Sequence, residues 1–375
     1  MKKFLLVLVA AITMAACTPS TQSDTLQRYS NQTVEGGFDT IITIIAYTKT
    51  QQEFNKYYEM MRDEFYRYHQ LYDKYNSYEG IQNIYTINQQ AGIAPVTVDQ
   101  SIIDLLLLSK EWYEKSNGLF DATLGAVLKV WHNYREQGLI DNQNGKEATI
   151  PDMATLEEAK KCTGWEFVEI DEVAKTVYLT DACASLDVGG VAKGYATELV
   201  AQKLAAEGLD KAVINAGGNV RTIGNKVNDE PWAVGIESPD MGLSDSLDTI
   251  RLPKTGSFVT SGDYQRFFVG PGGVTYHHLI DPNTLLPGRN MRSVTIIMED
   301  SGLADIVSTI LFLATYEEGV ELIESLQNQF PDQVIGAIWV FNQGQAPANS
   351  QFRSSGGYSI VISPSLTSYS RIFAS

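Results

Sequence analysis

The chain has 375 residues, and its 28 Lys and Arg residues against 45 Asp and Glu residues give a formal net charge of −17 at pH 7. Such a surface repels nucleic acid and anionic lipid, so neither is expected as a partner of the folded part. Hydrophobic residues make up 44% of the chain and aromatic residues 10%, which is enough for the core of one large or two ordinary globular domains.

The N-terminus predicts a lipoprotein signal peptide over residues 1–16. Two lysines precede an apolar run, 4–16, which fits a signal peptide and is too short to span a bilayer. Small residues lead into Cys17, as in bacterial lipoprotein signals, so we expect lipidation there and an exported protein. The membrane would then be contacted through the lipid anchor only, on the extracytoplasmic side. A plain secretory signal with a chance cysteine is the alternative. The polar residues 17–33 predict a flexible tether, and residues 34–375 a single domain.

The first part of the domain is predicted to form a strand followed by helices. Residues 36–46 are rich in β-branched side chains and predict a strand. Aromatic residues recur over 54–75 at steps of three and four, which predicts an amphipathic helix with a buried aromatic stripe. Asp99 is expected to cap a second helix that ends near Gly118. The polar residues 135–155 predict a surface excursion.

A strand-to-helix turn over residues 184–197, ASLDVGGVAKGYAT, is the most informative stretch. It follows a predicted hairpin, 165–180, and its glycines permit close approach of the backbone to a ligand. The helix N-terminus offers free N–H groups to an anion such as phosphate. The positive charge of Lys193 in the first helical turn is unfavourable with the helix dipole unless an anion lies there. The alternative is a surface lysine beside a tight turn. Neither the P-loop nor the dinucleotide-binding pattern matches this spacing.

A second apolar run, residues 212–224, also contains a glycine pair. Two such elements suggest backbone that approaches one ligand from two sides, although glycine in ordinary turns is the more common cause.

Two adjacent histidines, His277 and His278, lie in a predicted hairpin over 266–280. Successive strand residues point to opposite faces, so at most one of them can face a given site, and periodicity does not choose between them. A histidine there suits general-base catalysis near neutral pH, and a solvated strand histidine is the alternative.

An apolar helix over residues 303–313 contains Asp305 and Thr309, four residues apart and so on one face. A carboxylate and a hydroxyl suit a hard cation such as Mg²⁺, completed by a backbone carbonyl, water or substrate phosphate. Alternatively, Asp305 caps the helix and Thr309 bonds back to its carbonyl.

The remaining cysteines, Cys162 and Cys183, could pair in an exported protein, and they lack metal-ligand spacing. The mixture of hairpins and helices indicates an α+β fold.

Taken in order, the motifs resemble the bacterial FAD:protein FMN transferase (ApbE) family. The resemblance covers roughly residues 36–313 and rests on YNSYEGIQNIYTIN, NGLFDATLG, SLDVGGVAKGYAT, INAGGNV, TSGDYQRFF, YHHLIDPNT and LADIVST. It implies a T-fold-like architecture with antiparallel sheets and packed helices. It also implies Mg²⁺-dependent transfer of FMN from FAD to a threonine hydroxyl of an acceptor flavoprotein, with release of AMP. The acceptors would be exported or membrane-bound electron-transfer proteins.

The resemblance also implies roles for individual residues. Asp305 and Thr309 would hold Mg²⁺ together with the backbone carbonyl of Gly190. His278 is the better match to the family's recurring histidine and would act as the base for the acceptor hydroxyl. The implied FAD contacts are Phe38, Tyr78, Leu119, Phe120, Asp121, Asp187, Lys193 and Ile280. Two other functions remain open, namely an FAD-binding lipoprotein without chemistry and an FAD diphosphatase that passes FMN to water.

The sequence departs from the usual family pattern at three places. Phe38 and Asp39 stand where many members have Met-Gly, and Asn219 stands where aspartate is frequent. Leu285 occupies a position after a threonine where glycine is usual.

Overall fold

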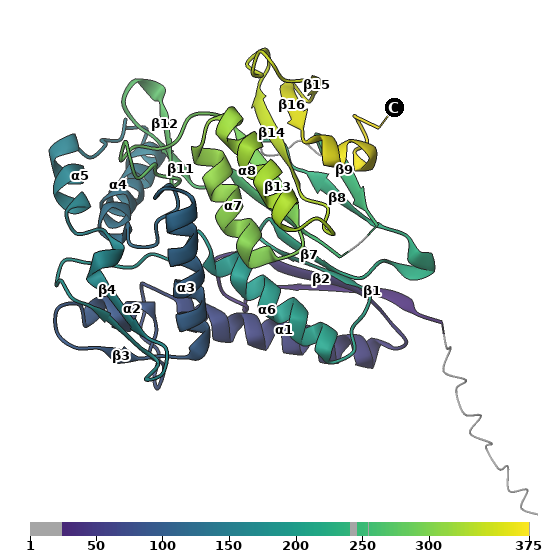
Figure 1. The fold of residues 1–375 in the computed structure, drawn as a ribbon, viewed down its shortest axis with the longest axis horizontal. Helices are drawn as coiled ribbons and strands as arrows, with labels where there is room; N and C mark the ends of the chain where they lie inside the picture. Colours follow the sequence, from purple (N-terminus) through teal and green to yellow (C-terminus); the bar gives the residue numbers. More distant parts are fainter. Residues whose placement is uncertain (1–24, 241–245, 254, 375) are drawn as a thin grey trace, which may run out of the picture.

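A computed structural model describes residues 25–240, 246–253 and 255–374, and a nine-stranded antiparallel sheet forms its centre (Figure 1). The strands of this main sheet are, in spatial order, β1 (Gln27–Thr33), β2 (Ile42–Thr48), β6 (Ala212–Ala216), β7 (Asn219–Ile223), β10 (Ser257–Gly262), β13 (Ser293–Met298), β14 (Gly336–Asn342), β16 (Tyr358–Ile362) and β15 (Phe352–Ser355).

Both faces of the main sheet are covered, which explains why its inner strands are apolar on both sides. In β14, Ala337, Trp339 and Phe341 face one core, whereas Ile338 and Val340 face another, as the two-residue repeat of a strand requires. The first core packs against the helices α1 (Gln51–Tyr72), α6 (Ala192–Ala206), α7 (Ser301–Leu313) and α8 (Tyr316–Gln329), which lie in front of the sheet in Figure 1. The second core packs against the hairpin of β8 (Trp232–Ile236) and β9 (Asp248–Leu252) and against the C-terminal segment.

A lobe beside the main sheet is formed by helices and two small sheets (Figure 1). Its helices are α2 (Ile84–Gln89), α3 (Gln100–Lys115), α4 (Gly125–Gln143) and α5 (Met153–Lys160). Its sheets are formed by β3 (Val96–Thr97), β5 (Thr176–Leu179) and β4 (Val168–Asp171), and by the hairpin of β11 (Phe267–Val269) and β12 (Thr275–His277). A separate apolar cluster that includes Trp131, Phe268 and Leu285 joins α4 to this hairpin.

The predicted α+β fold with antiparallel sheets and packed helices is confirmed. Asp99 caps α3 and accepts a hydrogen bond from the Ser101 amide at 2.9 Å, as expected. The predicted hairpin over 165–180 is formed by β4 and β5.

One local prediction is wrong. The tether predicted over 17–33 does not extend to its end, because Gln27–Thr33 form β1 and pair along their whole length with β2. The tether was inferred from polar composition, but an edge strand needs only one partner and tolerates polar side chains. Residues 135–155 are mostly exposed, as predicted, and they include the second half of α4, which continues to Gln143.

The predicted signal peptide and the lipidation site Cys17 lie outside the described residues. Within the described residues, no helix is long and apolar enough to cross a membrane.

Candidate functional site

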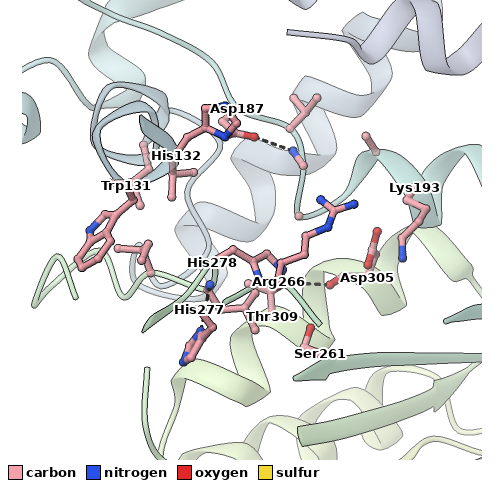
Figure 2. Close-up of a pocket in the computed structure, with 18 of the residues that line it drawn as sticks. Trp131, His132, Asp187, Lys193, Ser261, Arg266, His277, His278, Asp305 and Thr309 are labelled. Atoms are coloured by element: carbon pink, nitrogen blue, oxygen red, sulfur yellow. Dashed lines mark hydrogen bonds between the residues drawn. The ribbon is translucent and has the colours of Figure 1, made fainter. Parts of the chain in front are cut away.

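A cavity of about 510 Å³ lies where the lobe meets the main sheet, and segments distant in sequence supply its walls (Figure 2). Of the predicted site residues, those that line it are Phe38, Leu119, Phe120, Asp121, Asp187, Gly190, Lys193, His278, Ile280, Asp305 and Thr309. The fold therefore brings together nearly all of the residues that the sequence analysis had assigned to one site.

Tyr78 is the exception among the described residues. Its hydroxyl donates to Asp73 Oδ2 at 2.7 Å and lies 3.3 Å from His69 Nε2. His69 and Asp73 line the cavity, whereas Tyr78 lies behind them. The structure therefore places Tyr78 in a supporting layer and not in the cavity wall.

The strand-to-helix turn begins at Asp187 and is held by the lobe. The Asp187 amide donates to Ala122 O at 2.8 Å, and the Gly189 amide donates back to Asp187 Oδ1 at 2.9 Å. The helix α6 then starts at Ala192, so Lys193 lies in its first turn as predicted.

Lys193 connects the two glycine-pair elements. Its Nζ donates to Gly217 O at 2.7 Å, so both elements do approach the same cavity. Burial lowers the pKa of Lys193, the negative charge of Asp305 opposes this, and Arg266 lowers the pKa further. The alternative of a surface lysine is wrong, because the side chain is half-buried and points to the cavity wall.

Asp187 forms an ion pair with Lys74, which the sequence analysis did not assign to the site. The pair is well buried, with side-chain exposures of 8% for Asp187 and 21% for Lys74. Burial alone would raise the pKa of Asp187, but the Lys74 ammonium and the Gly189 amide hold it below its usual value. Asp187 is therefore ionised at neutral pH.

Asp305 lies inside α7, whose N-cap is Asp300. Its Oδ2 accepts a hydrogen bond from the Gly194 amide at 2.8 Å, which joins α7 to α6. A Cβ atom at Gly194 would lie 2.3 Å from Ser301 O, so only glycine permits this close approach. Asp305 is thus not a cap, although the Thr309 hydroxyl does bond back to Asp305 O at 3.3 Å.

The donors around Asp305 fit a hard cation when substrate oxygens are included. Burial raises the pKa of Asp305, and Lys193 opposes this shift, so a cation beside the carboxylate would stabilise its charged form. A Cβ atom at Gly190 would lie 3.7 Å from the Thr309 hydroxyl oxygen, so the Gly190 backbone borders the same space. No group of three or more His, Cys, Asp or Glu side chains that could hold a metal occurs in the part of the chain that the structure describes. These residues offer oxygen ligands to a metal such as Mg²⁺ but would share it with the substrate.

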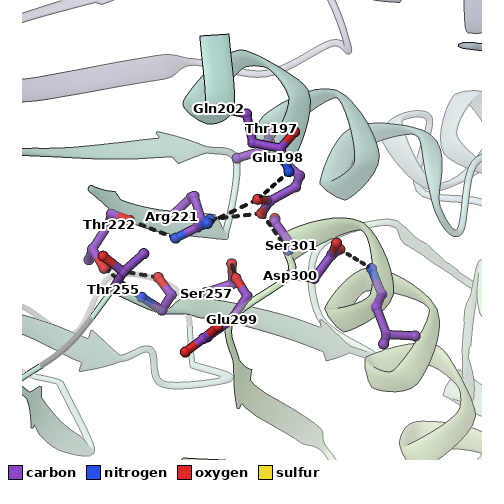
Figure 3. A network of polar contacts seen from close by, with 12 residues as sticks. Thr197, Glu198, Gln202, Arg221, Thr222, Thr255, Ser257, Glu299, Asp300 and Ser301 are labelled. Atoms are coloured by element: carbon purple, nitrogen blue, oxygen red, sulfur yellow. Dashed lines mark hydrogen bonds and ion pairs between the residues drawn. The ribbon is translucent and has the colours of Figure 1, made fainter. Parts of the chain in front are cut away.

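A buried polar network behind the cavity fixes the relative positions of α6 and α7 (Figure 3). Glu198 accepts two hydrogen bonds from Arg221, at 2.7 and 2.9 Å, and one from the Ser301 amide at 2.9 Å. Ser301 is the first residue of α7, so Glu198 satisfies a free amide at the start of the helix that carries Asp305. The sequence analysis did not identify this network.

The structure separates the roles of the two histidines. His277 is buried, and both of its ring nitrogens have backbone partners, Gly288 O at 2.7 Å and the Leu279 amide at 3.2 Å. His278 lines the cavity, and its Nδ1 is buried without a hydrogen-bond partner in the described residues. Burial is the largest cause that lowers the pKa of His278 to about 3, and Arg266 and then His277 lower it further. His278 is therefore a neutral imidazole at the cavity wall, with one buried ring nitrogen that has no protein partner among the described residues.

Cys162 and Cys183 form a disulfide bond, with their Cα atoms 5.4 Å apart. The bond joins the end of α5 to the segment that leads into Asp187. It therefore ties the lobe to the turn that borders the cavity.

The departures from the family pattern have local explanations. Phe38 and Asp39 both adopt positive φ, 57° and 50°, in a turn where glycine would be unstrained, and both line the cavity. Leu285 also has positive φ, 61°, and its side chain is buried in the apolar cluster with Trp131. Asn219 is buried beside α6, and its Nδ2 has no hydrogen-bond partner in the described residues.

The sequence analysis missed Lys74 and Arg266 as cavity residues. Arg266 belongs to TSGDYQRFF, a motif used for the resemblance but not assigned a role. Lys74 lies just after the aromatic helix. Nothing in the neighbouring sequence indicates its partner, Asp187, which is 113 residues away.

Comparisons with known proteins agree with this architecture. A family model described as the ApbE family matches residues 38–331. An FAD:protein FMN transferase of Treponema pallidum is 34% identical over 280 residues, covering 70% of this chain and 72% of the relative. Another, of Klebsiella pneumoniae, is 31% identical over 238 residues, covering 62% of this chain and 68% of the relative.

Solved structures are similar as well. The ApbE protein of Thermotoga maritima superimposes with a TM-score of 0.70 at 29% identity, covering 84% of this chain and 94% of that one. The flavinyl transferase ApbE of Pseudomonas stutzeri gives a TM-score of 0.70 at 20% identity and covers 94% of this chain and 98% of that one, which supports the fold alone. The chain belongs to the ApbE family.

Proposed function

We propose that this member of the ApbE family transfers FMN from FAD to a threonine hydroxyl of an acceptor flavoprotein, in the presence of Mg²⁺, and releases AMP. The observation that carries the proposal is the convergence of Asp305, Thr309, Lys193 and His278 on one cavity. The names of the two relatives support the same transferase activity. A binding protein would have no need of a neutral, unpartnered histidine beside a cation-binding carboxylate.

The chemistry required is the exchange of the phosphoanhydride bond of FAD for a phosphoester bond to the acceptor. The acceptor hydroxyl oxygen forms a bond to the phosphorus of the FMN half, and the bond from that phosphorus to the bridging oxygen breaks. AMP leaves with the bridging oxygen and the electron pair, and the hydroxyl proton passes to the base. Charge therefore increases on the phosphoryl and bridging oxygens and must be stabilised there.

The residues of the cavity match these needs. Lys193 and the amides at the start of α6 would bind the diphosphate. Asp305, Thr309 and the Gly190 carbonyl would hold Mg²⁺, which when bound neutralises charge on the diphosphate oxygens. The aromatic and apolar residues Phe38, Phe120 and Ile280 would pack against the flavin.

His278 would accept the proton of the acceptor hydroxyl. With a pKa of about 3 in the protein alone, it is unprotonated at physiological pH but only a weak base. A bound diphosphate would raise this pKa, because its negative charge stabilises the imidazolium. The base would therefore become stronger once the substrate is present.

The direct test is to incubate the purified chain with FAD, Mg²⁺ and a flavin-free acceptor domain that carries FMN on threonine in its native form. We expect a fluorescent acceptor band in a denaturing gel, and we expect EDTA to abolish it. An acceptor whose threonine is replaced by alanine is the matched control. FMN released into solution without labelling of two different acceptors would favour the diphosphatase, and bound, intact FAD would favour the binding protein.

We further propose that the protein is exported and anchored through a lipid on Cys17, where it would serve exported or membrane-bound electron-transfer proteins. The support is the sequence pattern at the N-terminus. Labelling of cells with a fatty-acid analogue should mark the protein and should fail with Cys17→Ser. Equal labelling of both forms would contradict the anchor.

A further inference from the structure

The cavity has four cationic side chains from lysine and arginine, and one of them differs from the others. Lys74, Arg135 and Lys193 each have an acceptor or an ion-pair partner within the protein. Arg266 lines the same cavity but makes no hydrogen bond or ion pair with any residue in 25–240, 246–253 or 255–374. Arg266 is exposed, so water can solvate its five free donors, and they remain available to an anion that enters the cavity.

The hairpin of β11 and β12 fixes the position of Arg266. Phe267 pairs with His277 in the antiparallel register. The ladder ends at this pair, and Arg266 and His278 are the next residue on each side of its open end, both lining the cavity. Figure 2 shows both side chains in the cavity, with Lys193 on the far side of Arg266.

The electrostatics agree with this placement. After burial, Arg266 is the charged group that most lowers the pKa of His278, and it also lowers the pKa of Lys193. Its guanidinium thus lies near both residues. Under the proposed function, Lys193 binds the diphosphate and His278 takes the acceptor proton, so the space between them is where the attacked phosphorus must lie.

We propose that Arg266 is a catalytic residue whose guanidinium binds the phosphoryl oxygens of the FMN half of FAD at the phosphorus attacked by the acceptor hydroxyl. This inference rests on the proposed function. As the oxygen–phosphorus bond to the acceptor forms and the bond to the AMP oxygen breaks, negative charge accumulates on these phosphoryl oxygens. The planar guanidinium can donate two parallel hydrogen bonds to them, which a lysine cannot do.

The test compares Arg266→Ala with wild type for transfer at saturating FAD and Mg²⁺, and for FAD binding measured separately without metal. We expect kcat to fall roughly 10²- to 10³-fold, as for the loss of one transition-state donor, while the Kd for FAD rises by less than about tenfold. Guanidinium ions added to the alanine variant should restore part of the rate. Arg266→Lys keeps the positive charge but cannot donate two parallel hydrogen bonds, so its kcat should remain well below that of wild type.

Arg289→Ala is the matched control. Arg289 follows the same hairpin, donates to Thr275 O at 3.0 Å and lines a different cavity, so its loss should leave transfer unchanged. Thermal unfolding shows whether each variant is folded, and Arg266→Gln provides a second test if the alanine variant is not.

The outcomes separate the two proposals. No transfer by the wild-type chain contradicts the proposed function itself. If the wild type transfers FMN and kcat of a folded Arg266 variant stays within about threefold, the inference is overturned while the function stands. A large loss of FAD affinity with unchanged kcat would also overturn it, because Arg266 would then contribute to binding only.

Discussion

The polar network behind α7 and the polar groups of the cavity are built from the same kinds of residue. They differ in how many of their charged groups have hydrogen-bond partners within the protein. In the network, Glu198 accepts four hydrogen bonds, from Arg221, Ser301 and Gln202, and each Arg221 nitrogen has an acceptor. In the cavity, Arg266 and His278 Nδ1 have no partner among the described residues.

The difference indicates what each region is for. The Glu198 carboxylate and the Arg221 guanidinium are fully bonded within the protein, so their contribution is to hold α6, α7 and β7 together. The buried, unpartnered Nδ1 of His278 carries an energetic cost, whereas the exposed Arg266 keeps its donors free for a ligand. Variants of the two regions should therefore fail in different ways, the first by unfolding and the second by losing activity while folded.

The largest effect is expected for Asp305→Asn. The amide keeps an acceptor for the Gly194 N–H but removes the charge that would hold Mg²⁺, so transfer should fall by at least about 10³-fold with weak flavin binding retained. Asp300→Asn is the matched control, because it removes the same charge from the same helix and asparagine remains a good N-cap. Initial rates of acceptor labelling and melting curves measure both properties. Wild-type activity in Asp305→Asn would contradict the metal assignment.

The sequence could predict the parts of the site that depend on local pattern. The four-residue spacing of Asp305 and Thr309 and the position of Lys193 in the first turn of α6 follow from helix geometry alone. The family resemblance supplied most of the other cavity residues, including His278.

The parts that depend on tertiary structure could not be predicted. The ion pair of Lys74 and Asp187 spans 113 residues, and the pair of Glu198 and Arg221 joins a helix to a strand. Neither partner has a pattern that points to the other. The placement of Arg266 depends on where the short strands β11 and β12 end and on their register, which side-chain periodicity does not predict for strands of three residues.

Loss of the buried ion pair between Arg221 and Glu198 should lower the stability of the protein. Arg221→Met leaves Glu198 buried without its counter-charge, which should cost about 3–5 kcal/mol of the free energy of unfolding. The double variant Arg221→Met with Glu198→Gln should recover most of this loss, because no uncompensated charge remains. Urea unfolding followed by tryptophan fluorescence measures the change. Transfer per folded molecule should stay close to wild type, and a large fall there would assign the network a direct part in catalysis.

Leu285→Gly tests whether backbone strain or packing dominates at a departure from the family pattern. Glycine would relieve roughly 1–2 kcal/mol of left-handed strain, but removing a buried leucine side chain costs about 2–5 kcal/mol. We therefore expect a net loss of roughly 2 kcal/mol in stability and little change in transfer. Thermal and urea unfolding measure whether the free energy of unfolding falls or rises. A more stable variant would show that the relief of backbone strain outweighs the loss of packing.

The ion pair of Lys74 and Asp187 combines the two kinds of region, because it is a completed pair that lines the cavity. In wild type, Lys74 and the Gly189 amide outweigh burial and keep the pKa of Asp187 below its usual value. His132 also faces this carboxylate and lowers its pKa slightly. Asp187 therefore stays ionised throughout the neutral and mildly acidic range, and its proposed contact with FAD should not vary there.

Lys74→Met should make that contact depend on pH. Without the ammonium, burial raises the pKa of Asp187 relative to wild type, so the carboxylate takes up a proton at a higher pH than it does in wild type. FAD affinity of the variant should then weaken by up to about tenfold for each pH unit below the raised pKa, while wild type stays flat. Lys74→Arg keeps the cation and should behave as wild type. Flavin fluorescence titrations at several pH values without metal measure this effect, and parallel profiles for wild type and Lys74→Met would show that Asp187 does not bind FAD through its charge.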